Sequence, residues 1–376
     1  MRVLLAPDGF GGTLSPVEAA AAMAQGWRAA APHDELDLAP LSDGGPGLVE
    51  VLAAALRGAQ RRKVLVEDPL ARPVRATFLL HSFAGGISAY LESAAACGLH
   101  LLREDERNPG TTTTYGVGQL IRAALDAGAT RIVVGLGGST TNDGGAGMVA
   151  ALGVCAYDAA GERLAPGGAA LRRAARLGGR LDPRLAAVDL VAATDVDSPL
   201  LGLRGASAVF GPQKGASRED VALLDGALTR WADVLEPFLG VVVRDEPGAG
   251  AAGGLGTALL AVGAHRTSGL ALIQQIVGLP ERVAAADLVL TGEGTLDETS
   301  LSGKVVSGVT ALAAEHAVPC LVLAGQVRVG RRELRTAGVA AAYSLVERVG
   351  REAALARPAE ELASLAARVA RQWSAR

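Results

Sequence analysis

One pattern recurs along this 376-residue chain and limits how it can fold: a short apolar run, a glycine-rich loop and then an amphipathic stretch. The apolar runs and the loops that follow them are Val3–Ala6 with PDGFGGTLS, Glu35–Leu38 with LSDGGPG, Arg131–Val134 with GLGGSTTNDGGAG, and Leu288–Thr291 with GEGTLDETSLSGK. Strands that alternate with helices through such loops predict an α/β protein with mostly parallel strands. Because ligands bind at the carboxyl ends of strands in this architecture, we expect the loops to converge on one site.

The loop after the first apolar run ends in a signal for the start of a helix. Ser15 is the expected N-cap, Pro16 takes the first helical position and Glu18 the third, which is the capping-box arrangement. The amphipathic stretch that follows predicts a helix over residues 16–31. Its N-terminus faces the loop and carries a partial positive charge, which favours an anionic ligand there.

The length of the chain predicts two domains, because a single core rarely grows beyond about 250–300 residues. The stretches Val64–Leu80 and Ile87–Glu92 break the alternation and predict antiparallel strands around turns. We therefore predict that residues 1–60 and 286–376 form a discontinuous Rossmann-like or flavodoxin-like domain with a mostly parallel sheet. Residues 61–285 are predicted to form an inserted α/β domain with a mixed sheet, and the active site is expected in a cleft between the two.

Composition excludes several classes of function. A net charge of −3 and an aromatic content of 3% argue against a nucleic-acid partner, which usually requires a basic surface and stacking rings. No apolar stretch approaches the ~20 residues of a membrane helix, and the first residues do not resemble an export signal, so we expect a cytoplasmic protein without a membrane partner. The sequence also lacks the motifs of P-loop NTPases, protein kinases and zinc peptidases.

The glycine-rich loops carry the candidate functional residues. Glycine lets the backbone approach a phosphate closely, carboxylates hold Mg²⁺ or accept a proton, and lysine neutralises phosphoryl charge. The loops contain two of the only three lysines in the chain; the full set is Asp8, Asp43, Asn142, Asp143, Asp195, Asp197, Lys214, Glu293, Asp297 and Lys304. An Asp in such a loop also commonly caps a turn, and this alternative stays open for each residue taken alone.

The same loops resemble those of bacterial glycerate kinases of the type that also acts in glyoxylate and sugar-acid breakdown. The motifs that carry the resemblance are APDGFGGTLSPVEAA, SDGGPG, NPGTTTTYGVG, GLGGSTTNDGGAGMVAALG, ATDVDSPLLGLRGASAVFGPQKGA, PGAGAAGGLG and TGEGTLDETSLSGKVVSGV. They run through the chain in the order of the family. The resemblance implies a two-domain α/β kinase, unrelated to P-loop or protein kinases, that uses ATP and Mg²⁺ to phosphorylate D-glycerate, in most relatives to 2-phosphoglycerate.

The resemblance also implies roles for individual residues. Asp195 or Asp43 is the expected general base, and Lys214 and Lys304 are expected to contact phosphate. The expected ligands of Mg²⁺ are Asp297 and Asp197. Contacts to the substrate and nucleotide are expected from Asp8, Gly137, Gly138, Ser139, Asn142, Asp143, Gly292 and Glu293.

The chain departs from the family pattern at a few positions. Relatives usually carry Lys at the position of Gly9 or Gly11, more often Glu at Pro46, and often Asn at Ser198. The missing lysine leaves open a catalytically silent metabolite-binding homologue. Two further alternatives are a kinase for another small hydroxy acid and an enzyme that forms 3-phosphoglycerate. In each case we expect a monomer or homodimer that binds small molecules.

Overall fold

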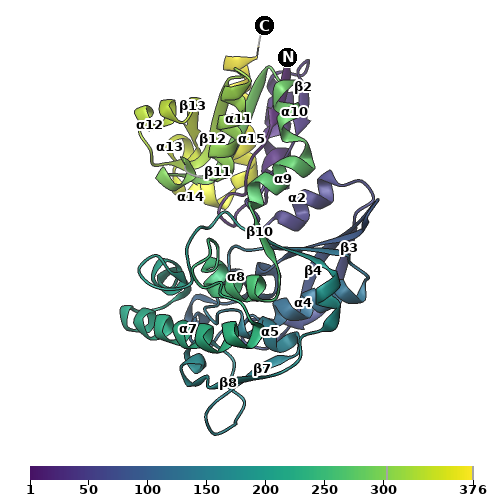
Figure 1. The fold of residues 1–376 in the computed structure, drawn as a ribbon. Helices are drawn as coiled ribbons and strands as arrows, with labels where there is room; N and C mark the ends of the chain where they lie inside the picture. Colours follow the sequence, from purple (N-terminus) through teal and green to yellow (C-terminus); the bar gives the residue numbers. More distant parts are fainter. Residues whose placement is uncertain (302–303, 375–376) are drawn as a thin grey trace. The chain divides into compact units, whose positions relative to one another are not determined.

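The computed structural model describes residues 1–301 and 304–374, so Ser302 and Gly303 of the last glycine-rich loop lie outside the described residues. The chain forms two compact units (Figure 1). Unit 1 comprises Met1–Asp43, Glu50–Arg57 and Leu270–Arg376, and unit 2 comprises Gly44–Val49 and Gly58–Gly269. The domain limits and the cleft expected from the sequence stay predictions.

Unit 1 contains a five-stranded sheet in which every pairing is parallel. Its strands are β1 (Arg2–Leu5), β2 (Glu35–Leu38), β11 (Leu288–Leu296), β12 (Cys320–Val327) and β13 (Val339–Ser344). Their order across the sheet, β13-β12-β11-β1-β2, is the flavodoxin-like order read from the opposite edge. The strand order reverses between β1 and β11, and such a switch point is where sheets of this kind bind ligands.

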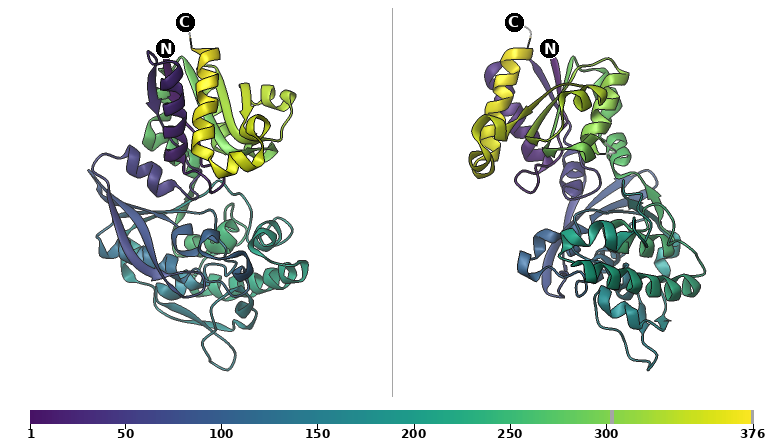
Figure 2. Two further views of the ribbon diagram at one scale, coloured as in Figure 1. Left: turned by 180° about the vertical axis from the view of Figure 1, so that it is seen from behind. Right: turned by 90° about the vertical axis from the view of Figure 1, so that its left-hand side faces the viewer.

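Helices cover both faces of this sheet. Figure 2 shows α1 (Pro16–Ala30) beside α15 (Pro358–Trp373), and Leu323 of β12 packs into the apolar cluster that contains these two helices. The next residue, Ala324, joins a second cluster with Val306 of α11 (Val305–Glu315). Burial of alternate residues on opposite faces is typical of a parallel sheet between two helix layers. The shorter helices of this part of the chain are α9 (Gly269–Val277), α10 (Leu279–Ala284), α12 (Arg331–Thr336), α13 (Leu345–Val349) and α14 (Arg351–Ala356).

The predicted first helix and its capping box are confirmed. Ser15 Oγ accepts the Glu18 N–H at 3.2 Å, and Glu18 Oε2 accepts the Ser15 N–H at 2.8 Å. Gly26 allows α1 and α15 to approach closely, because a Cβ at Gly26 would lie 1.8 Å from the Ala363 carbonyl oxygen. The helix is therefore fixed against its neighbour, and its N-terminus holds the end of the loop that follows β1.

Unit 2 contains a six-stranded mixed sheet with the order β10-β9-β6-β5-β4-β3. The pairs of β3 with β4 and of β4 with β5 are antiparallel, which confirms the antiparallel strands predicted around the two turns. The remaining pairs, from β5 to β10, are parallel. The strands are β3 (Gln60–Glu67), β4 (Pro73–Phe83), β5 (Gly86–Glu92), β6 (Arg131–Gly135), β9 (Asp189–Ala193) and β10 (His265–Thr267), and β7 (Val154–Tyr157) pairs separately with β8 (Arg176–Gly179).

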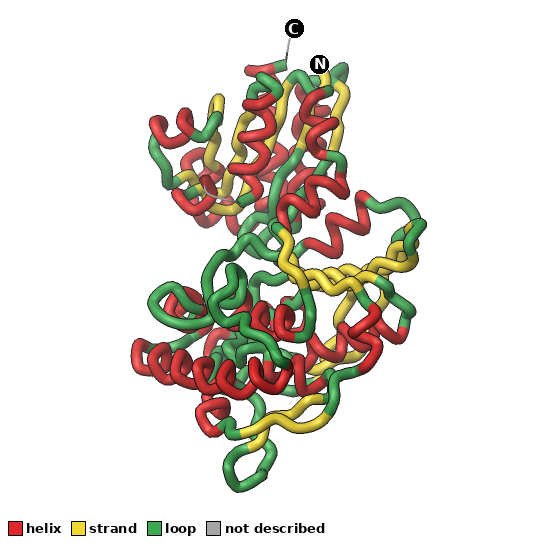
Figure 3. Tube along the Cα trace, in the orientation of Figure 1, coloured by secondary structure: helices red, strands yellow, loops and turns green. Residues whose placement is uncertain are grey.

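The core of unit 2 lies between the sheet and its helices, which Figure 3 shows in red against yellow strands. These helices are α3 (Ala94–Cys97), α4 (Tyr115–Asp126), α5 (Ala146–Ala151), α6 (Ala206–Phe210), α7 (Arg218–Leu239) and α8 (Ala251–Ala261), and α2 (Leu48–Ala55) carries residues of both units. In the described part of the chain no helix combines the length and the apolar character that crossing a membrane requires.

One local prediction is wrong. The sequence placed Gly292 and Glu293 in a loop after a strand that ends at Thr291, whereas β11 continues to Leu296. Pairing with β12 explains the extension, since Thr295 and Leu296 still pair with Gln326 and Val327. The glycines signalled a loop, but Gly292 instead permits close strand contact, because a Cβ there would lie 2.0 Å from the Leu323 carbonyl oxygen.

Candidate active site

Four charged side chains gather in unit 1 near the carboxyl ends of its central strands. Asp8 follows β1, and its backbone N–H donates to the Gly292 carbonyl oxygen of β11 at 2.8 Å. Asp43 follows β2, Glu293 lies in β11, and Lys304 directly precedes α11. Their charges act on one another. We call Asp8, Asp43, Glu293 and Lys304 the unit 1 cluster; it lies at the switch point of the sheet.

The unit 1 cluster holds more negative than positive charge. Burial, followed by the charge of Asp43, raises the pKa of Asp8 from 3.8 to about 7, with Glu293 adding to the rise and Lys304 opposing it. Burial also raises the pKa of Glu293. Glu293 Oε1 is buried and accepts no hydrogen bond from the described residues. Carboxylates that are crowded and incompletely paired favour the binding of a cation.

Asp297 and Lys304 flank the turn that follows β11. Asp297 Oδ1 accepts the Thr299 hydroxyl at 2.6 Å and the Thr299 N–H at 2.9 Å, and the Thr299 hydroxyl is the main reason that the pKa of Asp297 is lowered. Lys304 Nζ donates to the same Thr299 Oγ1 at 3.0 Å. Asp297 thus caps a turn, which is the alternative that the sequence left open for each loop Asp.

A second group of the candidate residues lies in unit 2, in the loop after β6, residues 137–143. Lys214 is only 2% exposed, and its Nζ donates to Ser139 Oγ at 3.0 Å and to the Thr141 carbonyl oxygen at 2.7 Å. Burial lowers the pKa of Lys214 to about 8, against the raising effect of Cys97 and Asp143. The buried ammonium therefore ties the 137–143 loop to the segment that carries Lys214.

Asp143 fixes the other end of this loop. Its Oδ2 accepts the N–H and the hydroxyl of Thr114, each at 2.9 Å, and the N–H of Gly147 at 3.1 Å. Its Oδ1 accepts the Gly145 N–H at 3.1 Å. Burial raises the pKa of Asp143, and these hydrogen bonds oppose the rise. Asp143 is thus a buried cap that joins the NPGTTTT and STTNDGG motifs.

The 137–143 loop also contains polar atoms without partners. Asn142 Nδ2 donates to Ser207 Oγ at 2.9 Å, but Asn142 Oδ1 and the hydroxyls of Thr140 and Thr141 are buried and unpaired within the described residues. Native proteins rarely leave buried polar atoms unsatisfied, and such exceptions are concentrated at functional sites. Gly138 has a φ of +64°, and a Cβ at Gly137 would lie 2.8 Å from Gly45 Cα, so both glycines serve the tight course of the loop.

Asp195 and Asp197 follow β9, which pairs with β6, so their loop leaves the sheet beside the 137–143 loop. Ser268 Oγ donates to Asp195 Oδ1. The side chain of Asp197 is 80% exposed and pairs with Arg266 at 2.6 Å. The structure thus orients Asp195 against a hydroxyl and places Asp197 at the surface.

Sequence reasoning missed several partners of these residues. Thr114, Ser207 and Ser268 each bond a candidate residue, but none was singled out. The run of threonines in NPGTTTT was visible as a motif, yet nothing in it indicated which hydroxyl meets Asp143. For Ser207 and Ser268 the sequence offers no signal, because both lie more than 60 residues from their partners: the separations are 65 and 73 residues.

Comparison with known proteins identifies the family. A family model described as the glycerate kinase family matches residues 3–374. The glycerate kinase of Bacillus subtilis strain 168 is 44% identical, over 92% of this chain and 90% of that protein. The glycerate 2-kinase of Escherichia coli K12 is 41% identical, over 93% of this chain and 92% of that protein. The chain therefore belongs to the glycerate kinase family.

The fold agrees with this assignment. A crystal structure assigned as glycerate kinase 2 from Salmonella typhimurium LT2 matches with a TM-score of 0.80 at 41% identity, covering 99% of this chain and 98% of that one. The resemblance seen in the motifs and the predicted fold class are both confirmed. The protein is a kinase, and membership of this family implies ATP as the phosphoryl donor.

Proposed function

We propose that the protein transfers the γ-phosphoryl group of ATP to the 2-hydroxyl of D-glycerate, giving 2-phosphoglycerate and ADP. The observation that carries this proposal is the presence, in a chain of the glycerate kinase family, of a separate polar site at the carboxyl ends of each sheet. We propose that unit 1 binds Mg²⁺ and ATP through the unit 1 cluster, and that unit 2 binds glycerate beside Asp195.

Unit 2 supplies the groups that an attacking hydroxyl needs. Asp195 is held by the Ser268 hydroxyl at the end of β9, where its carboxylate can accept the proton of the glycerate hydroxyl. The backbone N–H groups of the neighbouring 137–143 loop suit the carboxylate of glycerate. Lys214 is enclosed beneath this loop, so we propose that it positions Ser139 and Thr141, whereas the sequence predicted a direct phosphate contact.

The unit 1 cluster fits a magnesium ion. Glu293 has a buried oxygen without a partner, and Asp8 carries a raised pKa in a crowd of carboxylates. We propose these two as the ligands, since Asp297 caps a turn and Asp197 pairs with Arg266. Among the described residues no group of three or more potential ligands is placed to hold a metal alone, which suits an ion that keeps waters and binds phosphate. Bound Mg²⁺ would neutralise charge on the phosphate oxygens.

Replacement of Asp8 by Asn tests this magnesium site. With EDTA at pH 8, Asp8→Asn is expected to raise the free energy of unfolding by at most about 4 kcal/mol, because a pKa shift of one unit is worth 1.36 kcal/mol. The carboxylate costs stability increasingly as pH rises from 3.8 to about 7, so the gain should be smaller at pH 5. Mg²⁺ should raise the melting temperature of the natural protein at pH 8, and that of the variant less.

Asp297→Asn is the matched control for this measurement. It should lower stability, because it removes a turn cap, but it should keep the full response to Mg²⁺. Equal Mg²⁺ responses in the natural protein and in Asp8→Asn would contradict Asp8 as a ligand. A response lost in Asp297→Asn would restore the role that the family resemblance implies.

The alternative functions are separated by direct assays. Glycerate-dependent release of ADP in a coupled assay distinguishes a kinase from a silent binding protein. Phosphorus NMR of the product distinguishes 2-phosphoglycerate from 3-phosphoglycerate, and a panel of small hydroxy acids tests the acceptor. No glycerate-dependent ADP release would refute the proposal.

We expect the natural protein to be active although Gly9 and Gly11 replace the usual lysine. A lost charge-assisted hydrogen bond is worth about 1.5–3 kcal/mol, or roughly one to two decades in rate. Gly9 has room for a side chain, with its nearest neighbour 3.4 Å from a Cβ, whereas Gly11 has a φ of +54°. Gly9→Lys should therefore raise kcat/KM by about tenfold. Gly11→Lys should gain less, because a left-handed backbone strains any L side chain.

Steady-state kinetics with glycerate and Mg-ATP both varied make this comparison. Activity that appears only in a lysine variant would show that the natural protein is silent. Unchanged kcat/KM in Gly9→Lys would show that position 9 does not reach the phosphate.

A further inference from the structure

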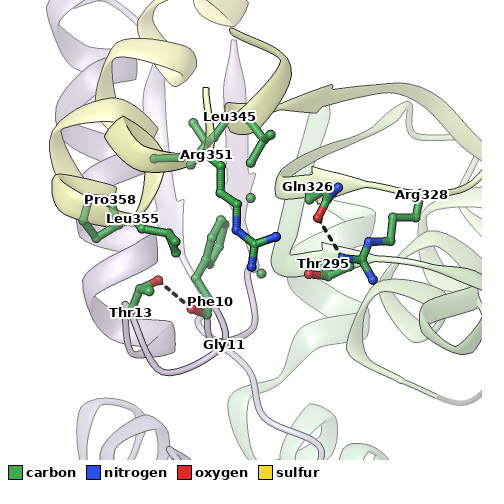
Figure 4. A pocket seen from close by; sticks show the side chains of 14 residues that line it. Phe10, Gly11, Thr13, Thr295, Gln326, Arg328, Leu345, Arg351, Leu355 and Pro358 are labelled. Atoms are coloured by element: carbon green, nitrogen blue, oxygen red, sulfur yellow. Dashed lines mark hydrogen bonds between the residues drawn. The ribbon is translucent and has the colours of Figure 1, made fainter. Parts of the chain in front are cut away.

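A pocket of about 160 Å³ opens at the carboxyl ends of β1, β11 and β12 in unit 1 (Figure 4). It combines apolar and cationic side chains. Apolar walls come from Phe10, Leu345, Leu355 and Pro358, and the guanidinium groups belong to Arg328 and Arg351. In Figure 4 the Arg351 side chain extends from the start of α14 to a position beside the ring of Phe10. The pocket is therefore suited to a ligand with both an apolar and an anionic part.

One wall of the pocket consists of backbone alone. Gly11, Gly294 and Gly325 line it and stack directly on one another. A Cβ at Gly294 would lie 2.8 Å from Gly11 N, and one at Gly325 would lie 2.4 Å from the Gly294 carbonyl oxygen. Without side chains on this wall a flat ring can lie close to the backbone.

The charge of the pocket is not neutralised by protein groups. Neither Asp nor Glu lines it. Among the described residues Arg351 pairs with no carboxylate, and Arg328 donates only to Gln326 Oε1 at 3.0 Å. Two arginines without carboxylate partners favour an anionic ligand, and guanidinium groups bind phosphate particularly well.

The position of the pocket connects it to the unit 1 cluster. Phe10 and Gly11 belong to the loop that carries Asp8, and Gly294 follows Glu293 in β11. A ligand in the pocket would thus continue from the groups proposed to hold Mg²⁺. Glycerate is a poor candidate, because it is small and polar and would leave the apolar walls unused.

We infer that this pocket binds the adenosine part of ATP, with the base against Phe10, Leu355 and the glycine wall and with Arg351 directed to the phosphates. This inference rests on the proposed function, because it assumes that unit 1 holds the nucleotide. It adds the subsite that recognises the base.

Leu355 allows a test in which charge is separated from packing. It lies at the pocket and is 55% exposed, so Leu355→Glu and Leu355→Lys should both fold. Both variants lose the same apolar contact, but only Glu repels phosphate. We expect the Kd for Mg-AMP-PNP, measured by calorimetry, to rise about tenfold more in Leu355→Glu than in Leu355→Lys.

Arg351→Gln provides the second variant. It should raise the Kd for Mg-AMP-PNP about tenfold through loss of a charged contact. Arg332→Gln is the matched control, because Arg332 is an exposed arginine of the same unit that does not line the pocket. Photolabelling with 8-azido-ATP should mark peptides that contain Phe10 or residues 345–358.

The outcomes decide the inference without reference to turnover. Unchanged nucleotide affinity in Leu355→Glu and Arg351→Gln would overturn it, as would photolabelling confined to other peptides. A rise in KM for glycerate alone would show that the pocket serves the acceptor, which also overturns it. Failure of the proposed function is read separately, as a natural protein that binds Mg-AMP-PNP in the pocket but releases no ADP with glycerate.

Discussion

Asp195→Asn is expected to lower kcat by at least about 10²-fold, the low end of the loss that follows removal of a general base. The amide has nearly the shape of the carboxylate but cannot accept the proton of the glycerate hydroxyl. Asp195 follows the buried strand β9 and is oriented by the Ser268 hydroxyl, so its carboxylate is held in one direction. Steady-state kinetics with saturating Mg-ATP and glycerate measure the effect.

Asp197→Asn is the matched control for this variant. Asp197 lies in the same loop, is 80% exposed and pairs with Arg266, so the substitution should change kcat little. Ser268→Ala should lower kcat less than Asp195→Asn, because it removes only an orienting bond. Turnover near that of the natural protein in Asp195→Asn would show that Asp195 caps its loop, and Asp43→Asn would then test the other candidate base.

Lys214→Met is expected to lower kcat by up to about 10²-fold, with little change in KM for ATP. A displacement of about 1 Å in a positioning group can have an effect of this size. The apolar side chain cannot bond Ser139 Oγ or the Thr141 carbonyl oxygen, so the 137–143 loop loses its support. Lys214→Arg should also be harmful, because Lys214 is almost fully enclosed and the larger guanidinium has no room.

Kinetics and unfolding curves of these variants separate positioning from phosphate contact. Lys63→Met is the control, since Lys63 is an exposed lysine of β3 in the same unit. A large rise in KM for ATP in Lys214→Met would show that the ammonium meets the nucleotide. Unchanged kcat in both Lys214 variants would show that neither role matters.

The fold class was predictable because it depends on patterns that are local in the sequence. The capping box at Ser15 and Glu18 satisfies backbone groups within three residues, so local sequence is sufficient to place it. The antiparallel strands around residues 68–73 and 85–86 were predictable for the same reason. The flavodoxin-like order of unit 1 was expected only as one of two folds, because strand order depends on which distant segments pair.

The candidate site was predictable as a set of residues but not as a set of contacts. Motifs brought Asp195 and Lys214 to attention, yet Lys214 bonds groups 75 and 73 residues away in the chain. The sequence suggested a lysine that meets phosphate, whereas tertiary packing buried its ammonium. The two arginines of the pocket in unit 1 belong to no motif and were not singled out.

The sequence by itself determined the alternation of strands and helices, the family and the residues that carry chemistry, because hydrophobic period, glycine position and motif order are properties of neighbouring residues. Only the tertiary structure decided which oxygen each donor meets, which charges are buried and how far β11 continues past Thr291. These features depend on desolvation and on hydrogen bonds between segments far apart in the chain, and both arise only when the chain is packed.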